Sequence, residues 1–318
     1  MKTKEYIKGI KSKDISILGK AITLIESSLE KDKNQAEELI NQCLPLVKST
    51  IKIGVSGTPG VGKSTFIESI GSKLIKQNTS IAILAIDPSS ALSKGSILGD
   101  KTRMNQLSNS KLAFIRPSPN SGILGGVAQN TKNAITICEA AGFEIIIVET
   151  VGVGQAEFIV KSMTDFFIYL TLTENGDELQ FSKKGILELS DIIIINKADQ
   201  NKKRAEEVSF LLKNSLSHYE DPKNVFICSA LTGLNIHTIL QHIKYIYIKK
   251  LNNGEIKKNR EEQELFWYKK NIKNEIINLF LKKTKIDDTI SNLSLPKNKS
   301  PRRQALSIIK KIFKEDEK

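Results

Sequence analysis

The run Gly-Thr-Pro-Gly-Val-Gly-Lys-Ser-Thr at residues 57–65 constrains this chain more than any other feature. It fits the phosphate-binding loop pattern, in which a glycine, four residues and then Gly-Lys-Ser connect a strand to a helix. Residues 51–56 read as a short buried strand, and residues 64–76 carry apolar side chains at helical spacing. The sequence therefore predicts a strand, loop and helix that bind nucleotide phosphates. A glycine-rich turn without a ligand is the alternative.

Each residue type in this loop has a physical purpose. Glycines let the backbone approach a polyphosphate closely, so that N–H groups and the positive end of the helix face the anion. Lys63 supplies a positive charge to the β- and γ-phosphates, and the Ser64 hydroxyl is a ligand for Mg²⁺. The residues assigned to the phosphates are Gly57, Thr58, Pro59, Gly60, Val61, Gly62, Lys63, Ser64 and Thr65.

Two later segments indicate which base is bound. Asn-Lys-Ala-Asp at residues 196–199 follows the β-branched run 191–195, and its final carboxylate can accept two hydrogen bonds from guanine. Adenine offers no such pair of donors and would leave the carboxylate desolvated and unpaired. A small-residue loop at 229–231 follows another predicted strand, and its backbone is suited to the guanine carbonyl. The nucleotide predicted is GTP, with base contacts from Asn196, Lys197, Asp199, Ser229, Ala230 and Leu231.

Carboxylates at the ends of two more predicted strands indicate where Mg²⁺ is held. Asp87 follows the strand 81–86, and Glu149 follows the strand 143–148. Either can hold the hydrated ion directly or through water. Because Glu149 is one methylene longer than the Asp usual in GTPases, we expect a water molecule to bridge its carboxylate and the Mg²⁺ ion.

No residue near these strands is an obvious catalyst for positioning the attacking water. The backbone N–H of Gly152 can reach the γ-phosphate, and Gln155 is a candidate for orienting the water. An ordinary glutamine on a helix surface is the alternative for Gln155. We therefore expect intrinsic GTP hydrolysis to be slow, and we expect a partner or a mobile loop to complete the catalytic site.

Several segments resemble one family closely. They are Asp-Pro-Ser-Ser-Ala-Leu-Ser-Lys-Gly at 87–95 and the stretch that follows it to 126, Glu-Thr-Val-Gly-Val-Gly-Gln at 149–155, and Gly-Asp-Glu-Leu-Gln-Phe-Ser-Lys-Lys-Gly at 176–185. They are similar to segments of the MeaB family of GTPases, which assist adenosylcobalamin-dependent methylmalonyl-CoA mutase and its relatives. The similarity is densest between residues 51 and 200.

The resemblance implies an architecture and a partner. It implies an N-terminal helical extension (1–50), a P-loop GTPase domain (51–250) and a C-terminal helical dimerisation arm (251–318). It also implies a homodimer that loads and protects the cofactor of an adenosylcobalamin-dependent acyl-CoA mutase, using Mg²⁺ and GTP and no tightly bound organic cofactor of its own.

The family pattern also implies roles for individual residues. Asp87, Asp100 and Glu149 would be the acids near Mg²⁺, and a second switch would cover residues 149–160. The first switch would be 87–103 with Arg103, although Lys94 stands where the family usually has glycine. A third switch at 174–185, which senses the mutase, would include Gln180 and Lys183. We expect Lys183 to offset charge on the γ-phosphate, with a solvated lysine as the alternative.

The pattern of the whole chain indicates an α/β fold. Residues 51–250 alternate between strands and helices, which is typical of a mostly parallel sheet covered by helices on both faces. Two helices are predicted within residues 14–50. After a break at 251–254, a helix is predicted over 260–284 and a last one over 302–314.

Composition agrees with a cytoplasmic protein. The three cysteines are isolated, which suits free thiols in a reducing compartment, and no apolar stretch is long enough for a membrane span. The net charge of +13 is concentrated in the last quarter, where lysines are scattered among helix-period apolar residues. Because no stacking aromatics or nucleic-acid motif accompany them, we expect neither nucleic acid nor membrane as a partner.

Two other functions stay open at this point. One is a metallochaperone-type GTPase that delivers nickel, although the sequence has no Cys/His cluster. The other is an accessory kinase or ATPase of an amino-acid transport system, a label attached to some relatives under the name ArgK. Asp199 argues against ATP in that case.

Overall fold

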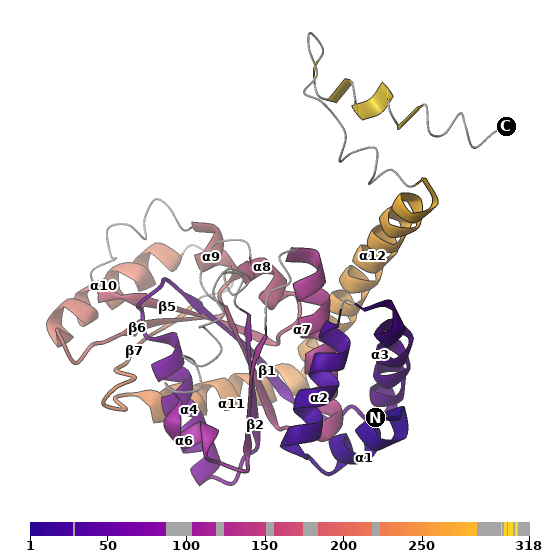
Figure 1. Cartoon of the computed structure of the whole chain (residues 1–318). Helices are drawn as coiled ribbons and strands as arrows, with labels where there is room; N and C mark the ends of the chain where they lie inside the picture. Colours follow the sequence, from indigo (N-terminus) through magenta and orange to yellow (C-terminus); the bar gives the residue numbers. More distant parts are fainter. Residues whose placement is uncertain are drawn as a thin grey trace. The chain divides into compact units, whose positions relative to one another are not determined.

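The computed structural model describes residues 1–27, 29–86, 104–118, 124–150, 156–173, 184–217, 223–284, 300, 302–303, 305–307 and 309–310. The chain divides into two compact units, Met1–Arg260 and Glu261–Lys318. The first unit contains the sheet and the helices that surround it (Figure 1).

A single parallel sheet organises the described residues of the first unit. Its seven strands lie in the order β3-β2-β4-β1-β5-β6-β7, and every neighbouring pair is parallel. The strands are β1 (Ile51–Gly57), β2 (Ile81–Ile86), β3 (Ala113–Ser118), β4 (Ile145–Thr150), β5 (Phe166–Leu172), β6 (Ile192–Asn196) and β7 (Asn224–Ile227). The sequence predicts strands near 51–56, 81–86, 112–116, 143–149, 165–172, 191–196 and 224–228. All seven are confirmed, with boundaries shifted by up to two residues.

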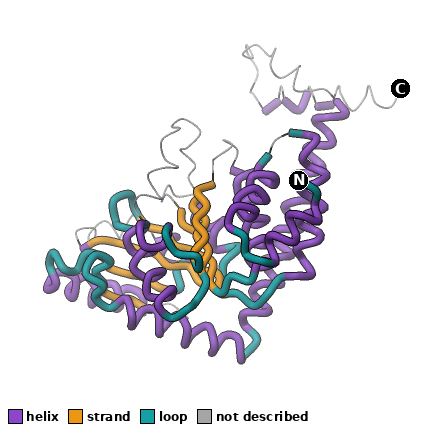
Figure 2. The backbone as a smooth tube through the Cα atoms, turned by 60° about the horizontal axis from the view of Figure 1, so that its bottom comes forward, coloured by secondary structure: helices purple, strands orange, loops and turns teal. Residues whose placement is uncertain are grey.

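Helices cover both faces of the sheet, as the sequence predicted (Figure 2). Along β6, Ile192 and Ile194 pack into one buried cluster, while Ile193 and Ile195 pack into another on the opposite face. Such a strand must be apolar throughout. The first face carries α4 (Lys63–Lys76), α6 (Asn105–Ser108) and α11 (Ile236–Asn252), and the second carries α7 (Leu124–Ala141), α8 (Ala156–Lys161), α9 (Lys184–Leu189) and α10 (Lys202–Leu216).

Three N-terminal helices pack on α7, namely α1 (Thr3–Lys11), α2 (Ile15–Glu26) and α3 (Glu30–Cys43), and the 3-10 turn η1 (Leu44–Leu46) follows them. The Asp14 carboxylate caps α2 by accepting hydrogen bonds from the backbone N–H groups of Ser16 and Ile17. Helices α2 and α3 were predicted from the sequence, whereas α1 was not. At nine residues, α1 is too short to be stable as an isolated helix, and it depends on burying Tyr6 and Ile10 against its neighbours.

The helix after α11 begins earlier than predicted. Gly254, with φ of +80°, ends the break, and α12 (Glu255–Thr284) starts at the next residue instead of near 260. Most of α12 belongs to the second unit. Of the predicted helix at 302–314, residues 302–303, 305–307 and 309–310 are described and helical.

Arg260 joins the first turns of α12 to the start of the sheet. Its Nε and Nη2 atoms donate to the two carboxylate oxygens of Asp165, each at 2.8 Å, and Nη2 also donates to the Thr50 carbonyl. The Lys52 N–H donates to the same carboxylate at 2.8 Å. The Asp165 side chain is buried, with 1% of its surface exposed. This buried ion pair holds together the beginnings of β1, β5 and α12.

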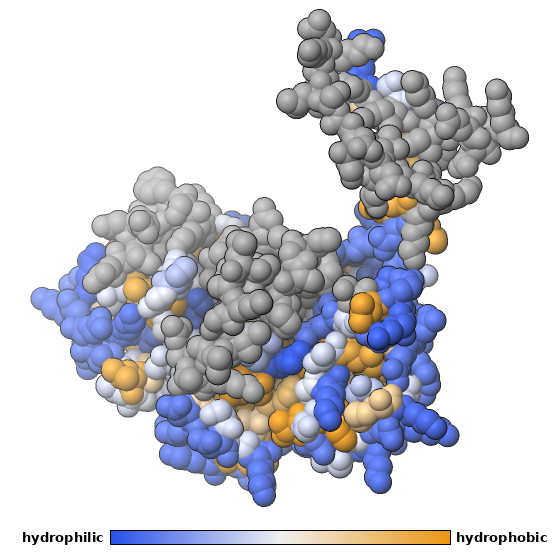
Figure 3. Space-filling view, viewed as in Figure 1, coloured by the Kyte–Doolittle hydropathy of each residue, from blue (hydrophilic) through white to orange (hydrophobic). Residues whose placement is uncertain are grey.

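Hydrophilic side chains cover much of the described surface visible in Figure 3, with apolar side chains gathered in smaller groups between them. Several lysines are engaged in ion pairs, including Lys52 with Glu139 and Lys161 with Asp191. Among the described residues, none of the helices combines the length and the apolar character needed to cross a membrane.

Candidate nucleotide-binding site

Two glycines of the loop at 57–65 are required by its shape. A Cβ on Gly57 would lie 2.5 Å from the Leu170 carbonyl oxygen, closer than any side chain permits. Gly62 has φ of +92°, and a Cβ there would lie 2.8 Å from Nδ2 of Asn196. The loop therefore connects the buried end of β1 to the start of α4 along a path that excludes side chains at positions 57 and 62.

Lys63 folds back across this loop. Its ammonium donates to the carbonyl oxygens of Gly57 at 2.9 Å and Thr58 at 3.3 Å. Burial lowers the pKa of Lys63, and the negative charges of Glu149 and Glu157 oppose this shift. The loop thus holds one cation beside the backbone N–H groups at the start of α4, an arrangement suited to an anion.

Two oxygen groups beside the loop fit the predicted Mg²⁺. The Ser64 hydroxyl donates to Oε1 of Glu149 at 3.3 Å. Glu149 lies near the end of β4, is 8% exposed, and is paired in register with Val55 of β1. A hydroxyl and a carboxylate at this separation are donors that Mg²⁺ prefers. Asp87 and Asp100 lie outside the described residues.

Asn196 links the loop to the predicted base-binding segments. Its Nδ2 donates to the Val61 carbonyl at 2.8 Å, and its Oδ1 accepts from the Ala230 N–H at 2.9 Å. The Cys228 thiol donates to the same Oδ1 at 3.4 Å. One buried amide thereby fixes the distance between the loop at 57–65 and the loop at 229–231.

The backbone of residues 196–199 is held against the end of β7. The Ala198 N–H donates to the Cys228 carbonyl at 3.0 Å, and Lys197 adopts a left-handed conformation with φ of +59°. The Asp199 carboxylate is exposed, while burial, reinforced by the Asp199 charge, raises the pKa of Cys228 to about 12. Asp199 therefore lies close to this junction with its oxygens accessible to a ligand.

The loop at 229–231 presents both polar and apolar groups. Ser229 is buried, and its Oγ accepts from the Thr232 N–H at 3.1 Å, which closes a tight turn. Ala230 is buried, whereas Leu231 is 80% exposed. Such a turn can place a small-residue backbone beside a flat base while Leu231 covers it from the solvent side.

The structure brings together the predicted residues that it describes. The residues at 57–65, 196–199 and 229–231 meet at the carboxyl ends of β1, β6 and β7, where ligands bind in open parallel sheets. The other predicted residues lie outside the described part of the chain: Asp87, Asp100, Arg103, Gly152, Gln155, Gln180 and Lys183.

A buried polar cluster behind the loop was not predicted from the sequence. Ser56, Thr150, Glu157 and Tyr169 come from β1, β4, α8 and β5, and each is at most 2% exposed. The alternation of side chains along β1 offered one signal, because it directs Ser56 away from Val55 and toward the opposite face. The partners of Ser56 could not be read from that pattern.

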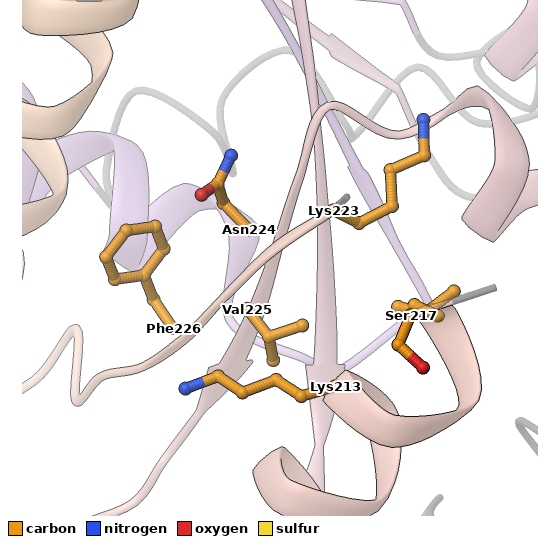
Figure 4. A pocket seen from close by; sticks show the side chains of 7 residues that line it. Lys213, Ser217, Lys223, Asn224, Val225 and Phe226 are labelled. Atoms are coloured by element: carbon orange, nitrogen blue, oxygen red, sulfur yellow. The ribbon is translucent and has the colours of Figure 1, made fainter. Parts of the chain in front are cut away.

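A cavity of about 400 Å³ lies elsewhere, beside β7 and the end of α10. Figure 4 shows Lys213 and Ser217 on the α10 side and Lys223, Asn224 and Phe226 along the strand. None of its lining residues belongs to the predicted nucleotide site.

A parallel sheet with this loop, followed by the 196–199 and 229–231 segments at the same edge, defines the class of P-loop GTPases. A family model described as "Methylmalonyl Co-A mutase-associated GTPase MeaB" matches residues 18–285, which is most of the chain. The chain belongs to this MeaB family.

Individual relatives agree with this result. The chain is 39% identical over 280 residues to "GTPase ArgK" of Escherichia coli (strain K12), covering 86% of this chain and 85% of the relative. It is 42% identical over 267 residues to "Methylmalonic aciduria type A homolog, mitochondrial" of Mus musculus, covering 79% of this chain and 64% of that one. The crystal structure of a protein named "LAO/AO transport system kinase" shares 31% identity and a TM-score of 0.76, with 97% of both chains covered.

Proposed function

We propose that this GTPase is a chaperone that assists cofactor loading and protection in an adenosylcobalamin-dependent acyl-CoA mutase. The observation that carries the proposal is the match over residues 18–285 to a family described as associated with methylmalonyl-CoA mutase. The name of the mouse relative, a methylmalonic aciduria type A homolog, supports the same class of client enzyme.

The geometry supports separate roles for the residues of the proposed site. Lys63 and the N–H groups of the loop would hold the β- and γ-phosphates, while Asp199 and Ala230 would recognise guanine. Ser64 and Glu149 would hold Mg²⁺, which neutralises negative charge on the phosphates when bound. The described residues supply binding and charge. The water-positioning group is proposed to come from the switch segments or the mutase.

We propose that the second unit is a dimerisation arm. Its part of α12 exposes apolar side chains at a spacing of three and four residues, which forms one stripe along the helix. The stripe consists of Leu265, Tyr268, Ile272, Ile276 and Leu279, each at least 43% exposed. Pairing with the same stripe of a second copy would remove these side chains from water.

A transport-associated kinase is the second candidate, favoured by the name of the relative whose crystal structure is similar over 97% of both chains. A kinase would pass the γ-phosphate to an acceptor, whereas the proposed GTPase would release inorganic phosphate. Incubation of the protein with GTP or ATP labelled on the γ-phosphate, together with an amino-acid-binding protein of a transport system, distinguishes the two. A kinase would transfer the label to the acceptor, whereas a GTPase would release it as inorganic phosphate. For the metallochaperone alternative, the described residues contain no group of three or more His, Cys, Asp or Glu suited to a metal ion.

Replacing Asp199 with Asn tests the choice of base. The change places an amide donor where guanine also presents donors, so affinity for GTP is expected to fall at least ~10-fold. Equilibrium titration with labelled GTP and ATP measures it, with the nearby exposed Gln200→Ala variant as a control. Unchanged GTP affinity in the Asp199 variant, or a wild-type protein that prefers ATP, would contradict the assignment of guanine as the bound base.

The client is tested by measuring GTP hydrolysis with and without a purified methylmalonyl-CoA mutase. We expect slow basal turnover of the wild type to accelerate when the mutase is present, and Lys183→Ala to lose most of that stimulation. Lys213→Ala, which changes a lysine on α10 beside the cavity of Figure 4, is the control and keeps the stimulation. Equal stimulation of all three proteins would contradict the role of Lys183. No stimulation of any would contradict the mutase as client.

A further inference from the structure

A buried carboxylate lies directly behind the phosphate-binding loop. Glu157, on α8, is 1% exposed, and its Oε1 accepts a hydrogen bond from the Ser56 hydroxyl at 3.2 Å. The Ser56 oxygen in turn accepts from the Thr150 hydroxyl at 2.8 Å. Ser56 immediately precedes Gly57, the first residue of the loop. The chain of hydrogen bonds therefore connects α8 and β4 to the base of the loop.

The packing of α8 keeps this carboxylate in place. A Cβ on Gly54 would lie 2.6 Å from Cγ1 of Val160 and 3.1 Å from Oγ1 of Thr164, so α8 and the turn after it lie against the backbone of β1. Thr164 also bonds to the Val160 carbonyl at 2.9 Å. Glycine at position 54 is what permits this close approach. Glu157 thus reaches Ser56 from a helix that has little room to move relative to the strand.

The charge of Glu157 acts on groups on both sides of Ser56. Tyr169 is the register partner of Ser56 on β5, and burial together with the Glu157 charge raises the pKa of Tyr169 to about 12. On the loop side, the same charge opposes the effect of burial on Lys63. The carboxylate is therefore within electrostatic reach of the place where phosphates are proposed to bind.

A neutral amide could make the same hydrogen bond with Ser56, so the bond alone does not require a carboxylate. A buried negative charge behind an anion-binding loop repels phosphate, and water screens this repulsion poorly in the interior. Its expected effect is to weaken nucleotide binding and speed dissociation.

We propose that Glu157 sets the rate of nucleotide release, by holding a negative charge behind the loop through its bond to Ser56. This inference rests on the proposed assignment of residues 57–65 to nucleotide phosphates. It assigns α8, most of which lies within the proposed second switch at 149–160, a role in GDP release that does not depend on Glu149.

The test measures how fast fluorescently labelled GDP leaves the full-length protein in Mg²⁺ when excess unlabelled GDP is added. Glu157→Gln keeps the size and the acceptor oxygen but removes the charge, so release is expected to slow at least ~3-fold. Glu144→Gln is the matched control. The Glu144 carboxylate also accepts a hydrogen bond from a serine hydroxyl, that of Ser80 at 3.2 Å, but it lies beside the opposite end of β4. The Glu144→Gln variant should therefore release GDP at the wild-type rate.

Glu157→Asp separates charge from packing. It keeps the charge but shortens the side chain, so release is expected to stay within ~2-fold of wild type if electrostatics dominates. A purely structural Glu157 would give the reverse order, with Gln tolerated and Asp disturbed in both release rate and melting temperature. This variant tests the proposal independently even if Glu157→Gln does not fold.

The outcomes separate this inference from the proposed function. A wild type that binds no labelled guanine nucleotide would overturn the assignment of the loop. A wild type that binds GDP, with Glu157→Gln releasing it at the same rate or faster, would overturn the role of Glu157 alone.

Discussion

Alanine in place of Lys63 is expected to reduce the rate of GTP hydrolysis at saturating GTP by roughly 10²–10³-fold, comparable to the loss of one preorganised donor in other active sites. The Lys63 ammonium lies 2.9 Å from the carbonyl oxygen of Gly57, the first residue of the loop. A bound γ-phosphate would present stronger acceptors than this carbonyl, and negative charge would develop on the leaving β-phosphate as the bond breaks. Removing the cation removes a stabilising charge that alanine cannot replace.

Phosphate release under single-turnover and steady-state conditions measures this effect, and labelled GTP measures binding separately. Lys73→Ala is the matched control, because Lys73 lies on the same helix in its last turn, away from the loop. Normal turnover in the Lys63 variant would show that residues 57–65 are not the catalytic site. A similar loss in the Lys73 variant would indicate that α4 as a whole had been destabilised.

Replacing Asp165 with alanine is expected to lower the free energy of unfolding by about 3–5 kcal/mol, since it leaves one member of a buried ion pair without its partner. Asp165 accepts two hydrogen bonds from Arg260 at 2.8 Å and one from the Lys52 N–H. The Arg260 side chain is only 26% exposed, so water replaces these bonds poorly. Chemical denaturation followed by circular dichroism measures the change.

An exposed ion pair provides the comparison. Glu207, 3.2 Å from Arg204 on the surface of α10, is expected to contribute at most ~1 kcal/mol, so Glu207→Ala should alter stability little. Changing Asp165 and Arg260 together to apolar residues is expected to recover part of the loss, because no buried charge is then left unpaired. If Asp165→Ala were no more destabilising than Glu207→Ala, the buried pair would not be a significant source of stability.

The features that could be predicted from sequence are those specified by consecutive residues. The order of strands and helices followed from the β-branched runs, such as 191–195, and from the helical spacing of apolar residues in α4. The helix α1 was missed because its nine residues are too few for a stable isolated helix, and its stability comes from contacts with α2, α3 and α7. The start of α12 was misplaced because Gly254 ends the break by its backbone conformation rather than by hydropathy.

The phosphate-binding loop is specified locally, since its backbone shape, charge and hydroxyl all lie within the nine residues 57–65. The distant residues that support this loop are brought to it only by the packing of the fold. Asn196 bonds to Val61 across 135 positions of the chain, and Glu157 bonds to Ser56 across 101. No local pattern encodes such pairs, because they depend on the strand order that places β4, β1 and β5 side by side and on the packing of α8 against them.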